Sequence, residues 1–115
     1  MDAAESSEKS SKVMKVLVVD DHLHTIETIS DVVEDMGHAP VGALSAEKAY
    51  DILNEGDIDV VLTDLVLTGD DGLKLLGFIR QNYPEVPAIL ISGHGTVETA
   101  VAALKDGALD FLVKP

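Results

Sequence analysis

KVLVVDD, residues 15–21, sets an unbroken apolar run directly before two aspartates. A short, β-branched run without polar interruption is typical of a parallel strand that is covered on both faces. Two further runs have the same form, VVLT at residues 60–63 before Asp64 and AILI at residues 88–91 before Ser92. Together they predict the central strands of one parallel sheet.

Between these runs the apolar residues recur every three or four positions, which is typical of amphipathic helices. More mixed runs at residues 39–43 and 110–113 complete five strands and are expected at the edges of the sheet. Helices are predicted over about residues 22–36, from the N-cap Ser45 to just before Gly56, and over about residues 72–82 and 96–106. This alternation predicts an α/β fold with a doubly wound parallel sheet.

The first predicted helix has a clear apolar stripe and a clear stop. Gly37 is expected to end it, because glycine readily adopts the left-handed conformation of a helix C-terminus. The side chains expected to face inward are Leu23, Ile26, Ile29, Val33 and Met36.

Polar side chains follow four of the predicted strands. Asp20 and Asp21 follow the first strand, Asp64 the third, Ser92 the fourth and Lys114 the fifth. In an open parallel sheet the ligand site lies at the carboxyl ends of the strands, so these residues are expected to meet in one pocket. Three acids, a hydroxyl and a lysine suit a divalent cation on oxygen ligands, with Mg²⁺ fitting best, and complement the charge of a phosphoryl group.

Each of these residues also has a purely structural interpretation. The Asp20-Asp21 pair could cap the following helix, Ser92 could satisfy the next turn, and Lys114 could be a solvated surface lysine. Clustered carboxylates repel one another, however, and a hard cation is the simplest reason to hold them together. The combination therefore favours a site over separate capping roles.

Composition limits the class of protein. With 115 residues the chain is expected to form one domain, from about residue 13 onward, behind a flexible tail at residues 1–12. The formal net charge of −13 argues against a nucleic-acid surface, and the absence of cysteine excludes disulfides and thiolate metal sites. No membrane span or signal peptide is evident, so a cytoplasmic location is expected.

The constellation resembles a family, the receiver domains of two-component response regulators, over about residues 13–115. The stretches LTDL at 62–65, DG at 71–72, ISGHG at 91–95 and DFLVKP at 110–115 are most similar to receivers of sigma-54-dependent transcriptional activators. The resemblance implies a flavodoxin-like sheet with strand order 2-1-3-4-5. It also implies that the chain, which stops at Pro115, is truncated after strand 5 and lacks the fifth helix of receivers.

The resemblance also implies a role for each site residue. Asp64 would be the phosphoacceptor, taking the phosphoryl group from a phosphohistidine of a sensor histidine kinase or histidine phosphotransfer protein. Ser92 and Lys114 would hold the phosphoryl oxygens, and Phe111 would relay the change to an output domain or partner, although a buried phenylalanine is an equally good interpretation of that position. The ligands of Mg²⁺ would be Asp21 directly, Asp20 through water, Asp64, and the backbone carbonyl of Val66.

Three further expectations remain open at this point. The chain would catalyse only its own phosphorylation and dephosphorylation, so it would not be an enzyme in the usual sense. A Mg²⁺-dependent phosphohydrolase of the haloacid dehalogenase type is disfavoured because Val66 stands where those enzymes need a second acid; a receiver-like module without phosphorylation is the other alternative. Without a fifth helix, some of Val16, Val18 and Leu112 would be exposed, which would allow a homodimer.

Overall fold

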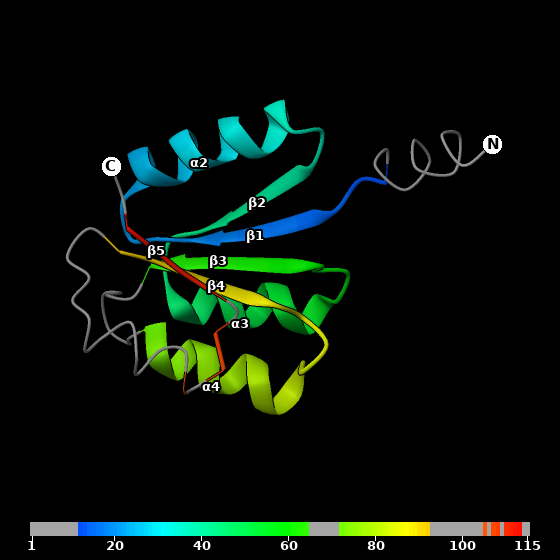
Figure 1. Cartoon of the computed structure of the whole chain (residues 1–115), viewed down its shortest axis with the longest axis vertical. Helices are drawn as coiled ribbons and strands as arrows, with labels where there is room; N and C mark the ends of the chain where they lie inside the picture. Colours follow the sequence, from blue (N-terminus) through cyan, green and yellow to red (C-terminus); the bar gives the residue numbers. More distant parts are fainter. Residues whose placement is uncertain (1–11, 65–71, 93–104, 106, 109, 114–115) are drawn as a thin grey trace.

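The computed structural model describes residues 12–64, 72–92, 105, 107–108 and 110–113. The elements of this part of the chain alternate between strands and helices, as the sequence predicts (Figure 1). They are β1 (Lys15–Val19), α2 (Leu23–Asp35), β2 (Ala39–Ala43), α3 (Ala46–Glu55), β3 (Val60–Asp64), α4 (Gly72–Asn82), β4 (Ala88–Ser92) and β5 (Asp110–Val113). The helix predicted over about residues 96–106 lies almost wholly outside the described residues.

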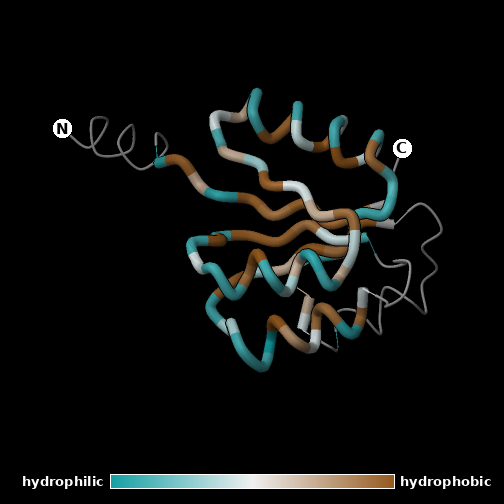
Figure 2. The backbone as a smooth tube through the Cα atoms, turned by 180° about the vertical axis from the view of Figure 1, so that it is seen from behind, coloured by the Kyte–Doolittle hydropathy of each residue, from teal (hydrophilic) through white to brown (hydrophobic). Residues whose placement is uncertain are grey.

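The five strands form one parallel sheet in the order β2-β1-β3-β4-β5. This order confirms the flavodoxin-like fold and places β2 and β5 at the edges, as their mixed composition predicts. Helix α2 covers one face of the sheet, and α3 and α4 cover the other (Figure 1). The three central strands therefore form the most hydrophobic part of the backbone tube in Figure 2.

Alternation along β1 divides the core between the two faces. Leu17 and Val19 pack in the cluster that also contains the buried side chains of α3 and α4. Val16 and Val18 point to the other face and pack against Ile26 and its neighbours on α2. Because successive side chains of a strand point to opposite faces, one apolar run supplies both layers.

The start of α3 and the end of α2 follow the predicted capping chemistry. The Ser45 hydroxyl accepts a hydrogen bond from the Lys48 backbone N–H at 3.1 Å, which confirms Ser45 as the N-cap of α3. Gly37 has φ of 89°, and its N–H donates to the Glu34 carbonyl at 2.9 Å while the His38 N–H donates to the Val33 carbonyl at 3.1 Å. This pair of bonds is a Schellman motif, which satisfies the last carbonyls of α2.

The inward stripe predicted for α2 is wrong at both ends. Ile26 and Val33 are buried, but Leu23 is 58% exposed and Met36 is 69% exposed. An α-helix turns by about 100° per residue, so these two side chains lie roughly 70° to either side of the line through Ile26 and Val33. The helix buries a narrower stripe than the spacing of its apolar residues indicates.

The exposure expected on the β1 and β5 strands is confirmed at one position only. Leu112 is 46% exposed, but Val16 and Val18 are 6% and 1% exposed. The two valines are buried because α2 packs directly on them. Within the described ranges, none of the helices combines the length and the apolar character that crossing a bilayer requires.

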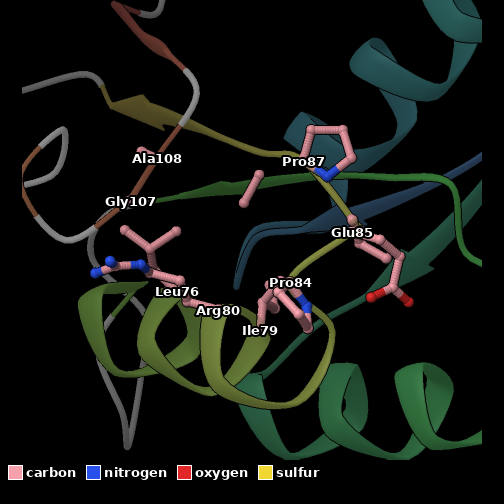
Figure 3. A pocket seen from close by; sticks show the side chains of 10 residues that line it. Leu76, Ile79, Arg80, Pro84, Glu85, Pro87, Gly107 and Ala108 are labelled. Atoms are coloured by element: carbon pink, nitrogen blue, oxygen red, sulfur yellow. The ribbon is translucent and has the colours of Figure 1, made fainter.

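Two glycines, one beside α4 and one inside it, should respond oppositely to replacement by alanine. Gly107 has φ of 104° and sits so close to the Arg80 side chain that an added Cβ would overlap it (Figure 3). We expect Gly107→Ala to destabilise the fold by about 1–2 kcal/mol or more. Gly77→Ala is the matched control, because Gly77 lies inside α4 with open space around it and should gain roughly 0.5–1 kcal/mol. Urea melts of both variants test this pair; equal effects would contradict it.

Candidate functional site

Three aspartates predicted to meet do so at the carboxyl edge of the sheet. Asp20, Asp21, His22 and Asp64 each offer one ligand atom, and these atoms all lie within 4.8 Å of one another. The strand register explains the meeting, because Val19 of β1 pairs with Thr63 of β3. The residues that come next are Asp20 and Asp64, so these two aspartates lie side by side at the carboxyl ends of adjacent strands.

Asp20, in the turn between β1 and α2, is held by hydrogen bonds to two backbone groups. Its N–H donates to the Ala43 carbonyl at 3.0 Å, which ties it to the end of β2. Its carboxylate Oδ1 accepts the His22 backbone N–H at 2.9 Å, and the residue is only 1% exposed. Asp20 therefore holds the turn before α2 but does not cap that helix, whose N-cap is His22 without a side-chain cap.

Asp64 ends the strand rather than following it. Strand β3 runs one residue further than predicted, because Asp64 pairs with Ile91 of β4. Its neighbour Thr63 is fully buried and donates its hydroxyl to the Asp64 carbonyl at 3.1 Å. Asp64 itself is 8% exposed, so a carboxylate is held on a rigid, central strand with restricted access to water.

His22 belongs to this cluster, although the sequence analysis did not single it out. Its Nδ1 lies 2.9 Å from Asp21 Oδ1 and 3.2 Å from Asp20 Oδ1. The one signal in the sequence was its position directly after the aspartate pair. That signal was insufficient because a side chain at the start of a helix can turn either back to the strand end or out to solvent.

The remaining predicted site residues are described only in part. Ser92 is the last residue of β4, and its backbone pairs with Val113 of β5. It directly follows Ile91, the residue that pairs with Asp64. Phe111 lies on β5, where its backbone pairs with Leu90. The side chains of Ser92 and Phe111 are not described, and Val66 and Lys114 lie outside the described residues.

The pocket in Figure 3 lies at the amino ends of the strands, on the side of the sheet opposite to the carboxyl ends. It has a volume of about 490 Å³ and is lined by residues that precede or begin β4 and β5, such as Pro87 and Ala108, together with residues of α4. The acidic cluster lies at the carboxyl ends of the strands instead. This pocket is therefore separate from the predicted site.

The donor atoms of the cluster fit a hard divalent cation. Three carboxylates, two of them on buried residues, gather at one point. Ionised carboxylates this close repel one another, and oxygen ligands are those that Mg²⁺ and Ca²⁺ prefer. The chemistry of the donor set, rather than any single residue, thus indicates a cation site.

Comparisons with known proteins show which sequences and structures this chain is similar to. The family model of the response regulator receiver domain matches residues 16–115. An NtrX-like response regulator of Rickettsia bellii is 42% identical over 105 residues, which are 90% of this chain and 22% of that protein. The chain thus spans about a fifth of the length of this curated relative.

Solved structures show the same fold. The beryllofluoride-activated receiver domain dimer of NtrC4 matches with a TM-score of 0.83 and 38% identity, over 88% of this chain and 84% of that chain. A response regulator of Burkholderia pseudomallei matches with a TM-score of 0.83 and 29% identity, over 89% of this chain and 60% of that one. The latter structure contains a phosphorylated aspartic acid, a calcium ion and citrate.

Proposed function

We propose that Asp64 accepts the phosphoryl group of a phosphorylation-dependent signalling switch, because this chain belongs to the response regulator receiver domain family. The observation that carries this assignment is the position of Asp64. It is a buried carboxylate at the end of a central strand, and it meets Asp20 and Asp21 within 4.8 Å. The members of this family are signalling domains. We propose that this chain catalyses only its own phosphorylation.

The phosphoryl donor would be a phosphohistidine on a sensor histidine kinase or a histidine phosphotransfer protein. A carboxylate oxygen of Asp64 attacks the phosphorus, and the P–O bond forms as the P–N bond breaks in line with it. The leaving imidazole keeps the electron pair of the broken bond and takes a proton from solvent. The product is an acyl phosphate on Asp64, and no further reactant is required.

The acidic cluster would hold Mg²⁺ during this transfer. Asp21 and Asp64 would ligate the ion directly, Asp20 would hold it through water, and the Val66 carbonyl would be a further ligand. When bound, the ion neutralises the carboxylates and the charge on the phosphoryl oxygens. Asp64 is already positioned by the β3–β4 pairing, so the chain itself contributes mainly the fixed geometry of the nucleophile.

Ser92 and Lys114 would bind the phosphoryl oxygens after transfer. The strand register supports this role for Ser92, because its backbone lies one position beyond the residue that pairs with Asp64. Phe111, on the neighbouring strand β5, would then shift and relay the change to an output domain or partner. The NtrX-like relative is much longer than this chain, so we propose that the switch controls another part of such a regulator.

Incubation with Mg²⁺ and acetyl phosphate tests the proposed function. Intact-mass measurement should show one added phosphoryl group, stable in acid and labile in base. Because the carboxylates need a cation to accept a dianionic group, excess chelator should reduce the labelling at least about tenfold. Labelling that is unchanged in chelator would contradict the role of the acidic cluster, and the absence of labelling in Mg²⁺ would contradict the phosphoacceptor assignment.

A further inference from the structure

We propose that His22 is an additional protein donor to the cation site and shifts its preference from Mg²⁺ toward divalent transition-metal ions such as Ni²⁺. This inference rests on the cation site of the proposed function. It concerns a residue that follows the aspartate pair and whose ring, although 72% exposed, turns back onto the cluster.

The distances from His22 Nδ1 to its two nearest carboxylate oxygens match those between neighbouring ligands on one ion. Bonds of about 2.1 Å in an octahedral site place neighbouring ligands about 3.0 Å apart. His22 Nδ1 is 2.9 Å from Asp21 Oδ1 and 3.2 Å from Asp20 Oδ1. The atoms of the cluster, including one from Asp64, all lie within 4.8 Å of one another. With an ion bound and the carboxylates drawn in around it, His22 Nδ1 would take a position that a water molecule would otherwise fill.

The turn between β1 and α2 holds the ring in this place. His22 is the N-cap of α2, with extended backbone dihedral angles and no hydrogen bond from its side chain to the first turn of the helix. Its backbone N–H donates to Asp20 Oδ1, the same oxygen that its ring approaches. The backbone N–H is thus directed to Asp20, and the ring nitrogen lies between the carboxylates of Asp20 and Asp21.

The chemistry of imidazole determines which ions would bind more tightly when His22 is a ligand. Mg²⁺ prefers oxygen ligands, whereas imidazole suits Ni²⁺, Cu²⁺ and Zn²⁺. Replacing one water by imidazole nitrogen should therefore strengthen Ni²⁺ binding and leave Mg²⁺ binding nearly unchanged. A hydrogen bond from Nδ1–H to the carboxylates is the competing explanation of the same distances, and it predicts no such selectivity.

Titration calorimetry on the tag-free chain separates these explanations. We expect His22→Asn to weaken Ni²⁺ binding about tenfold or more and to change Mg²⁺ binding less than about threefold. The matched control is His24→Asn, because His24 is an exposed histidine in the first turn of the same helix and lies outside the cluster. This control should bind both ions as the parent does.

A spectroscopic readout makes the test independent of affinity. In the Ni²⁺-loaded chain, paramagnetically shifted proton signals of a bound imidazole should be present in the parent and in His24→Asn and absent in His22→Asn. Equal losses of Ni²⁺ and Mg²⁺ binding in His22→Asn, or no loss of either, would overturn the inference. A parent chain that binds no Mg²⁺ would instead overturn the cation site and, with it, the proposed function.

Discussion

Asp64→Asn should abolish phosphorylation of this chain by acetyl phosphate in the presence of Mg²⁺. An amide oxygen has neither the charge nor the nucleophilicity of a carboxylate, and no acyl phosphate can form on it without loss of the amide nitrogen. The variant should still fold, because the ladder pairing of this residue with Ile91 involves only the backbone. We therefore expect complete loss of the mass increment at unchanged secondary structure.

Asp59→Asn provides the matched control for this experiment. Asp59 directly precedes the same strand but lies at its opposite end, where its Oδ2 accepts the Lys15 backbone N–H at 2.8 Å. An asparagine oxygen can accept the same bond, so the chemical change is identical and only its position differs. This variant should be labelled like the parent. Equal labelling of Asp64→Asn and the parent would remove Asp64 as the phosphoacceptor.

Asp20→Asn should stabilise the metal-free chain by about 1 kcal/mol or more while weakening Mg²⁺ binding. Asp20 is almost fully buried, and its carboxylate lies within 4.8 Å of those of Asp21 and Asp64. Two unit charges 4 Å apart repel by about 4 kcal/mol near a protein surface, and neighbouring groups and water offset part of that energy. The hydrogen bond from the His22 N–H would persist, because the amide oxygen of asparagine can accept it.

Urea melts with chelator, and then with Mg²⁺, measure both parts of this prediction. In chelator the midpoint of Asp20→Asn should exceed that of the parent at equal slope. At 100 times its dissociation constant Mg²⁺ should add about 2.7 kcal/mol to the parent and clearly less to the variant. Urea is preferred to guanidinium chloride because the salt would screen the repulsion. A variant less stable than the parent in chelator would show that Asp20 has mainly a capping role.

Much of the fold and of the acidic site could be predicted from local sequence. The runs at residues 16–19, 60–62 and 88–91 are apolar throughout because parallel central strands are covered on both faces, and that pattern needs no tertiary information to be recognised. Parallel strands also place their carboxyl ends at one edge of the sheet, so the meeting of Asp20 and Asp64 followed from the order of the elements.

Only the tertiary structure decided how wide the buried faces are and where individual side chains turn. Leu23 and Met36 follow a helical spacing but are exposed, because the contact of α2 with the sheet is narrower than its apolar stripe. His22 joins the acidic cluster because its ring lies close to the carboxylates of Asp20 and Asp21, which no periodicity specifies. The spacing of apolar residues indicates the class and order of the elements, whereas side-chain orientations and the widths of the buried faces are set only in the folded structure.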